Sequence, residues 1–229
     1  MRHGTINIYT ITAKQDSLDN PLPEYHQQYT TVLCYAYVVK TTFYFLTYLT
    51  MKYCQNCGSL VDLVVPEGDN RHRHVCASCG DIHYQNPKIV AGCLPIWEDK
   101  VLLCKRAISP RYDFWTLPAG FMENEETLEQ AALRESVEEA NAALENLRLY
   151  TVLSLPHISQ VYMMFLADLK NTNFSPGEES LQTELFTEQD IPWKELAFKT
   201  IDVTLRHYFY DRKQGTFPLH NSIVEKKNH

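Results

Sequence analysis

A dense run of acidic residues is the first feature of this 229-residue chain that could do chemistry. Residues 120–142, GFMENEETLEQAALRESVEEANA, hold seven carboxylates and a single base, Arg134. Thr127 followed by Gln130 is a capping box, which predicts that a helix begins there. Asn141 tolerates the left-handed conformation and would end that helix. At about 100° per residue, three carboxylates then share one helical face: Glu135, Glu138 and Glu139.

That face predicts a divalent-metal site. A solvated surface helix, which is the alternative, would interleave lysines at i,i+4, and this segment has none. Three like charges on one turn repel each other unless cations lie between them, and carboxylate oxygens are ligands that suit Mg²⁺ or Mn²⁺. Residues away from that face are expected to pack on a sheet: Leu133, Ser136, Val137 and Ala140.

Four of the seven cysteines form a second constellation. They make two CxxC knuckles, each followed by glycine and separated by 18 residues: Cys54, Cys57, Cys76 and Cys79. Glycine permits the positive φ of a tight turn, and four thiolates at this spacing are typical of a closed, structural zinc site. Two redox-active pairs are the alternative. We interpret His72, His74 and His83 as solvated loop residues, because a four-sulfur site needs no further ligand.

Composition and charge limit the class of partner. The odd number of cysteines favours a reducing compartment, so we expect a cytoplasmic protein. With 21 basic and 28 acidic residues, net charge −7, no nucleic acid is expected as a partner. Residues 32–50 are apolar but contain Lys40, so an extension outside the functional unit is favoured over a membrane segment. A small-molecule partner is therefore expected.

Apolar patterning predicts the elements that position these groups. Strands are expected at 87–97, 101–105, 147–153, 161–169 and 184–186, and further helices at 191–196 and 200–212. This order predicts an α/β fold in which helices flank a mixed sheet. The expected organisation is an extension of uncertain order over 1–50, a zinc ribbon over 51–85, a catalytic domain over 86–215 and a C-terminal tail over 216–229.

Residues just before the acidic run are candidates for substrate binding. Arg106 and Arg111 bracket a loop, and guanidinium groups suit phosphate oxygens, although a plain surface position is the alternative. Trp115, together with Phe114 and Tyr162, would stack on a base; a place in the hydrophobic core is the alternative.

The acidic run resembles the signature of the Nudix hydrolases. The matching positions are Gly120, five residues on Glu126, seven residues on Arg134 and Glu135, then two residues on Glu138 and Glu139. Two positions depart: Ser136 stands where an aliphatic residue is usual, and Asn141 where glycine is usual. The knuckles followed by IHYQNPKIVAG, VLLCKRAISP and WTLPAGFME are similar to the zinc-ribbon branch of that family, over residues 52 to about 213. The resemblance implies a Nudix-like α/β/α sandwich after a four-cysteine ribbon.

The resemblance also implies roles for the helix residues. Glu135 and Glu139 would be the principal ligands of Mg²⁺ or Mn²⁺, and Glu138 would complete the cluster. Arg134 would pair with a helix carboxylate and orient it, while Glu126 would brace the loop before the helix.

Two further roles come from the same resemblance. The backbone at Gly120 would reach the metal or the substrate. The general base varies within the family, and Glu179, with Glu178 as the alternate, is our candidate in the late loop SPGEESLQTELF. The alternative for Glu179 is an ordinary exposed loop glutamate.

The implied activity is hydrolysis of the pyrophosphate bond in a nucleoside diphosphate linked to another group. Relatives that act on NADH carry a motif of the SQPFPxPxS kind after the box, whereas this chain reads LSLPHISQVYMMF. ADP-ribose or FAD is therefore expected rather than NADH. A non-catalytic nucleotide sensor with a structural zinc ribbon is the alternative, and a homodimer formed through the ribbon is compatible with the enzyme.

Overall fold

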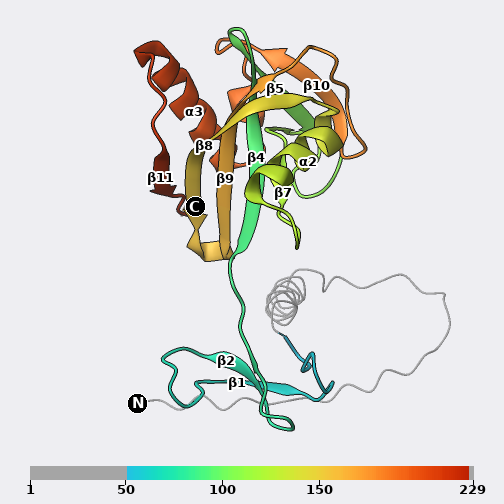
Figure 1. Ribbon diagram of the computed structural model, residues 1–229, viewed down its shortest axis with the longest axis vertical. Helices are drawn as coiled ribbons and strands as arrows, with labels where there is room; N and C mark the ends of the chain where they lie inside the picture. Colours follow the sequence, from blue (N-terminus) through green and yellow to red (C-terminus); the bar gives the residue numbers. More distant parts are fainter. Residues whose placement is uncertain (1–50, 227–229) are drawn as a thin grey trace, which may run out of the picture. The chain divides into compact units, whose positions relative to one another are not determined.

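The computed structural model describes residues 51–226, and the chain divides into two compact units between Tyr84 and Gln85 (Figure 1). The expectations for residues 1–50, an extension or a membrane segment, lie outside the described residues. Across 51–226, no helix is both long enough and apolar enough to cross a membrane.

The described part of the first unit is a three-stranded antiparallel ribbon. It contains β1 (Val61–Val64), β2 (Arg73–Cys76) and β3 (Ile82–His83), in the order β1-β2-β3. Its buried hydrophobic residues are Cys54 and Cys76. An apolar core of this size cannot hold a fold, so the stability of the ribbon must come from its cysteine end.

The second unit contains an eight-stranded mixed sheet. The long strands are β4 (Lys88–Trp97), β5 (Lys100–Arg106), β8 (Leu144–Leu155), β9 (Gln160–Leu169), β10 (Ser180–Phe186) and β11 (His220–Ile223). Their order is β10-β5-β4-β9-β8-β11, with β6 (Trp115–Thr116) paired to β5 and β7 (Ala119–Phe121) paired to β4. The β4–β9 and β8–β11 pairs are parallel and the others antiparallel.

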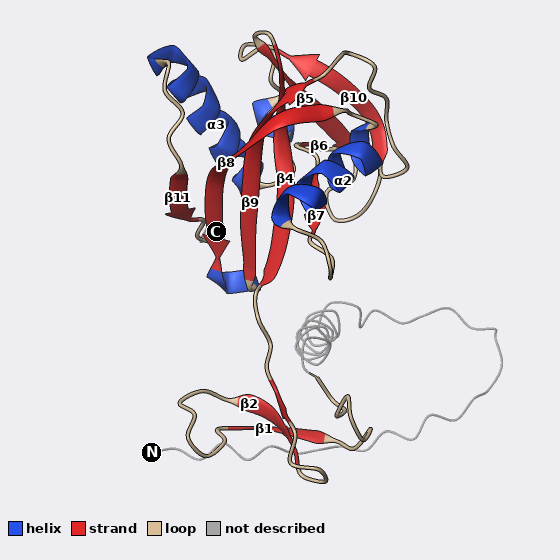
Figure 2. Ribbon diagram, viewed as in Figure 1, coloured by secondary structure: helices blue, strands red, loops and turns tan. Residues whose placement is uncertain are grey.

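Two helices, α2 (Leu128–Ala140) and α3 (Lys199–Gln214), cover opposite faces of the sheet (Figure 2). Because side chains alternate along a strand, Cys93 joins the core beneath α2, whereas Leu94 joins the core beneath α3. α2 contributes three alanines to its core, Ala131, Ala132 and Ala140, whereas α3 contributes large aromatic residues that include Tyr208 and Phe209. The fold is thus an α/β sandwich with a mixed sheet, as the sequence indicates.

Two expected elements differ from the structure. Segment 191–196 forms only the short 3-10 helix η2 (Trp193–Glu195), because the chain then extends at Leu196 and pairs with Trp115. Residues 216–229 were expected as a tail, but His220–Ile223 pairs with β8 and becomes the edge of the sheet. That strand has no apolar alternation, so its sequence carried no signal for it.

Candidate active site

The acidic helix α2 begins and ends at the residues that its sequence predicts. The Thr127 hydroxyl accepts a hydrogen bond from the Gln130 N–H at 3.2 Å, and the Gln130 side chain accepts one from the Thr127 N–H at 2.7 Å. Asn141 adopts the left-handed conformation, φ 48° and ψ 29°, and closes the helix. These caps fix the rotation at which the helix presents its glutamates to the sheet.

Fewer residues of α2 pack on the sheet than the sequence predicts. Ser136 and Ala140 are fully buried, and the Ser136 hydroxyl donates to Ala132 O at 2.7 Å, so this departure from an aliphatic residue is satisfied within the helix. Val137 does not pack on the sheet: it is 53% exposed and lines a cleft. One residue beyond Ser136 turns the side chain by about 100°, away from the sheet.

Glu135 and Glu139 lie buried between α2 and the strand β7, with 8% and 5% of their surfaces exposed. The Ala119 N–H donates to Glu139 Oε2 at 3.2 Å. Burial raises the pKa of Glu139 to about 8, and the neighbouring Glu135 charge adds to the effect. Burial also raises the pKa of Glu135, against the opposing effect of Arg134. Carboxylates in this state gain most from a bound divalent cation, which favours their charged form.

Arg134 is the centre of an ion-pair network on α2. Its Nε and Nη2 lie 3.0 Å and 2.9 Å from the two oxygens of Glu126, which also accepts the Glu123 N–H at 2.7 Å. Its Nη1 lies 2.8 Å from Glu135 Oε1 and 2.8 Å from Glu138 Oε2. Glu126 therefore ties the loop before the helix to Arg134, and Arg134 bridges Glu135 and Glu138.

The three glutamates of the predicted cluster do not all point to one place. Within 51–226, the groups of three or more potential ligand atoms that lie within 4.8 Å of one another are all in the ribbon. Glu138 is exposed and turned to Arg134, whereas Glu135 and Glu139 are buried. The structure thus brings Glu135 and Glu139 together as the inner pair and leaves Glu138 on the outer side.

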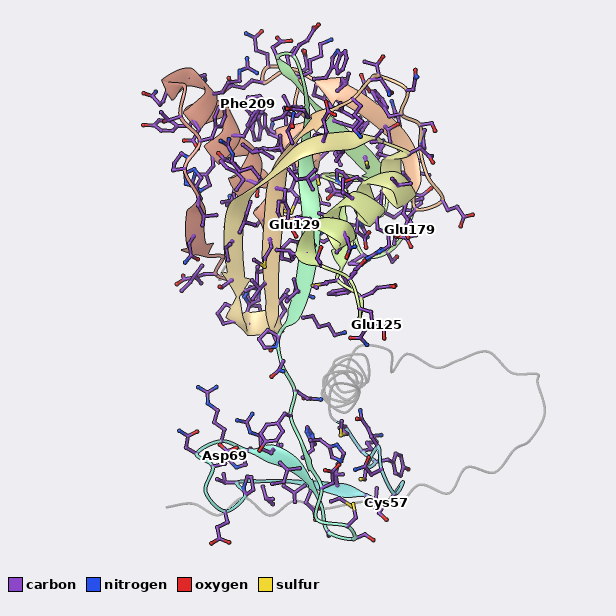
Figure 3. All side chains as sticks on the ribbon, in the orientation of Figure 1. Cys57, Asp69, Glu125, Glu129, Glu179 and Phe209 are labelled. Atoms are coloured by element: carbon purple, nitrogen blue, oxygen red, sulfur yellow. The ribbon has the colours of Figure 1, made fainter. Side chains whose placement is uncertain are left out.

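The loop that precedes β10 brings Glu178 and Glu179 to the same region. Both are exposed and both line the cleft. The Glu179 charge contributes to the raised pKa of Glu135 and of Glu139, so it acts on the inner pair. Figure 3 shows Glu179 near the C-terminal end of α2, whereas Glu129 lies on its first turn.

The cleft beside these carboxylates has a volume of about 1960 Å³. Arg106 and Arg111 both line it. Arg106 is 8% exposed; its Nε donates to Pro110 O at 3.0 Å, and its guanidinium lies 5.2 Å from the centre of the Phe198 ring. The Arg111 guanidinium lies 5.5 Å from the Phe114 ring. These arginines add positive charge to the lining of the cleft, and the Arg106 charge acts on Glu139, whose pKa it lowers against the larger effect of burial.

Trp115 does not line the cleft. Its side chain is 6% exposed and packs edge-on against Phe186, with ring centres 4.9 Å apart, in the core beneath α3. The aromatic residues that do line the cleft are Phe114, Phe121, Tyr162, Trp193 and Phe198. The sequence did not predict that Phe198 lines the cleft, nor that residues 224–226, which follow β11 in the chain, do so. No local motif marks either segment.

The cysteine end of the ribbon can hold a tetrahedral metal ion. Sγ distances are 3.6 Å between Cys54 and Cys79 and 3.4 Å between Cys57 and Cys76. A zinc ion bound at about 2.3 Å would place its sulfurs about 3.8 Å apart, so these sulfurs fit it closely. Gly58 and Gly80 have φ of 73° and 76°, as the knuckle pattern predicts. A hydrogen bond from Ser59 lowers the pKa of Cys57 to about 6, which favours the thiolate.

Two ribbon histidines contradict the expectation of solvated loop residues. His74 lies on β2 and His83 on β3, opposite each other in register, and each is 7% exposed. Their Nε2 atoms make no hydrogen bond within the described residues. His72 is exposed, as expected. The pairing of β2 with β3, which local sequence does not reveal, is what buries His74 and His83.

The chain matches two family models and several known proteins. Residues 52–85 match the Nudix N-terminal zinc ribbon and residues 86–211 match the NUDIX domain. The NAD-capped RNA hydrolases NudC of Photobacterium profundum and Edwardsiella ictaluri are 30% and 34% identical over 61% and 57% of this chain. The chain spans about half the length of these curated relatives, 50% and 49%.

A solved structure agrees with the family models. The crystal structure of a NUDIX hydrolase from Nitrosomonas europaea is 56% identical and has a TM-score of 0.74, covering 77% of this chain and 100% of that one. The NUDIX model matches more than half of the chain and coincides with the unit that contains the acidic cleft. The chain therefore belongs to the Nudix family, with the family's N-terminal zinc ribbon before its NUDIX domain.

Proposed function

We propose that the protein hydrolyses the pyrophosphate bond of a nucleoside diphosphate linked to another group, with divalent cations bound at the acidic face of α2. The observation that carries this proposal is the buried pair Glu135 and Glu139, which share one cleft with Arg106 and Arg111. Buried carboxylates with raised pKa values suit a metal site, and guanidinium groups suit a diphosphate.

The chain's residues have separate tasks in such a reaction. Glu135 and Glu139 would hold Mg²⁺ or Mn²⁺, with Glu138 available once it leaves Arg134. Bound cations would neutralise the diphosphate and lower the pKa of an attacking water. Arg106 and Arg111 would orient the diphosphate for in-line attack.

The reaction needs one base and no covalent intermediate. Glu179 would accept a proton from the water while the water oxygen forms a bond to one phosphorus. The bridging P–O bond then breaks, and its electron pair leaves with the second phosphate. Two monophosphates result.

The relatives bear on the choice of substrate. They are named for NAD-capped RNA, which supports an NAD-type pyrophosphate and does not support the expected preference for ADP-ribose or FAD over NADH. The 3-10 turn η1 (Pro156–Ile158) stands where NADH-cleaving relatives carry their SQPFPxPxS motif, and His157 and Ile158 line the cleft. We propose substrates in which a pyrophosphate joins adenosine to a second ribose, with the NAD type first.

We also propose a nucleic acid attached to the NAD group as a substrate, contrary to the expectation from net charge. The cleft, at about 1960 Å³, is larger than the usual small-molecule pocket of about 300–1,000 Å³. Its lining also includes Lys194 and Lys226, together with Lys199 and Arg206, which both pair with Asp202. The volume of the cleft and the charges of Lys194 and Lys226 support binding of additional phosphates.

A substrate panel tests the proposal. NADH, NAD, ADP-ribose, FAD, a nucleoside triphosphate and an NAD-capped oligoribonucleotide would each be incubated with Mg²⁺ or Mn²⁺, and released monophosphates measured through phosphatase treatment. We expect NAD and NADH to yield AMP and a nicotinamide mononucleotide, and the NAD-capped oligoribonucleotide to yield a nicotinamide mononucleotide and an RNA with a 5′-monophosphate. Tight nucleotide binding without hydrolysis of any member would support the sensor instead.

We further propose that the ribbon binds one structural zinc ion and pairs two chains in a homodimer. The four sulfurs would hold the ion and would leave no open position for catalysis there. Light scattering of the full chain, with and without a zinc chelator, would measure the molecular mass in solution and so report whether the dimer depends on the zinc-bound ribbon.

A further inference from the structure

The C-terminal end of α2 is tied by one side chain to the loop that carries Glu179. The Asn141 amide nitrogen lies 3.2 Å from Ser175 O, 3.2 Å from Ser175 Oγ and 3.3 Å from Pro176 O. We propose that Asn141 is a positioning residue, which holds this loop so that Glu179 faces the inner acidic pair. The inference rests on the proposed hydrolytic function, because it assigns Glu179 a part in the reaction.

Backbone contacts show how closely the loop docks on the helix end. The Ser175 N–H donates to Ala140 O at 2.9 Å, and the Gly177 N–H donates to Glu139 O at 3.1 Å. A Cβ at Gly177 would lie 1.7 Å from Glu138 O, so only glycine allows this approach. Two carbonyls that the last turn of α2 leaves open, those of Glu139 and Ala140, are thus satisfied by the loop.

The same loop is fixed on its other side. The Ser180 N–H donates to Gly177 O at 3.1 Å, and the Ala107 N–H, just after β5, donates to Glu179 O at 2.8 Å. Glu179 is therefore held between the end of α2 and the end of β5. A shift of the loop along the helix would therefore move the Glu179 carboxylate relative to Glu139.

Asn141 supplies something that the residue usual at this position of the family signature cannot. Glycine takes a positive φ at less cost than asparagine, but it has no side chain and cannot donate to Ser175 or Pro176. Asparagine tolerates the left-handed conformation and adds an amide with two hydrogens. The substitution Asn141→Gly therefore removes the tie and leaves the backbone conformation of the helix end allowed.

Chain position 146 offers a matched control. Asn146 also has a positive φ, 55°, and its exposed amide donates to Asp168 Oδ2 at 3.0 Å, but it does not line the cleft. Asn146→Gly removes an exposed asparagine amide of the same kind from a left-handed residue. We expect it to leave kcat and KM unchanged.

The test is a double-variant cycle on the full chain, with the substrate that the wild type cleaves fastest. We expect Asn141→Gly to lower kcat about tenfold with KM changed less than about twofold. In the Glu179→Gln background, Asn141→Gly should add little, because the group that it positions is already inactive. Amide exchange at Ser175 and Gly177 should be faster in Asn141→Gly than in the wild type.

Several results would overturn the inference. These are a wild-type kcat for Asn141→Gly, rate losses that multiply in the double variant, or an Asn141→Gly effect that disappears with Glu178→Gln instead of Glu179→Gln. A wild type that cleaves no substrate would speak against the proposed function itself. In that event unchanged amide exchange at Ser175 and Gly177 would still overturn the tie, and faster exchange would support it.

Discussion

Gly120 lies directly against the carboxylate of Glu135, so that a Cβ at position 120 would stand 2.3 Å from Glu135 Oε1. The contact places a strand residue of β7 against a residue of α2. Because the far end of a side chain can move more easily than a backbone, a methyl group here would displace the carboxylate and not the strand.

Gly120→Ala should therefore reduce activity more than stability. We expect the rate to fall at least about tenfold, because the displaced Glu135 can no longer hold a metal ion in place. Gly92→Ala is the contrasting variant, since its Cβ would lie 2.3 Å from Ala119 Cβ and 2.5 Å from Pro118 O. It should cost about 1–3 kcal/mol of unfolding free energy. Steady-state rates and urea unfolding of both variants check this; equal loss of stability in the two would contradict it.

The ribbon should lose its fold when its metal is removed. We expect about one zinc ion per wild-type chain and none in Cys57→Ala, because a ribbon with no apolar core depends on its metal. Cys104→Ala, which removes a buried thiol in the core beneath α2, should keep the zinc. Metal analysis measures the zinc content of each variant, and amide exchange over residues 54–83 measures whether the ribbon is folded. Zinc retained by Cys57→Ala, or a protected ribbon without zinc, would contradict the assignment.

The buried carboxylate of Asp211 joins α3 to β8 and β11. Its Oδ2 accepts the Tyr150 hydroxyl at 2.7 Å and lies 2.6 Å from His220 Nε2. Burial opposes its charge, but the hydrogen bonds from His220 and Tyr150 outweigh that effect and lower the pKa of Asp211 below its ordinary value. A carboxyl group of this kind stabilises the fold above the unfolded-state pKa, and the contribution is lost as pH falls through the folded-state pKa.

Tyr150→Phe should thus destabilise the protein in a pH-dependent way. At pH 7 we expect a loss of about 1–3 kcal/mol, because a buried charge loses one hydrogen-bond donor. The difference from the wild type should shrink as the pH falls through the folded-state pKa of Asp211, which lies below its ordinary value, because a protonated carboxyl group depends less on the missing donor. Urea unfolding of both proteins between pH 7 and 3 provides the measurement. A difference that stays constant or grows with acid would contradict it.

Local chemistry made some parts of the site predictable from sequence. The capping box at Thr127 and the left-handed Asn141 define α2, because a cap depends on residues within one turn. The knuckles at Gly58 and Gly80 are equally local. For the same reason Glu135 and Glu139 could be placed on one face before any tertiary structure was considered.

Other parts depend on contacts between distant segments. Trp115 lies in the core and Phe198 in the cleft because Ala197 N–H bonds to Trp115 O at 2.8 Å, and this pairing joins positions far apart in the chain. His74 and His83 are buried by register, and the strand His220–Ile223 is recruited by β8 without an apolar pattern. Periodicity describes single elements and contains no information about their partners.

The rate of Glu139→Gln compared with that of Glu129→Gln tests most directly whether α2 carries a catalytic metal site. Glu139 is buried beside Glu135, whereas Glu129 is exposed on the first turn. With Mg²⁺ and the best substrate of the panel, Glu139→Gln should be slower by about a hundredfold or more, since an amide cannot replace the charge that divalent cations need. Glu129→Gln should keep the wild-type rate. Hydrolysis at the wild-type rate by folded Glu139→Gln would contradict the account.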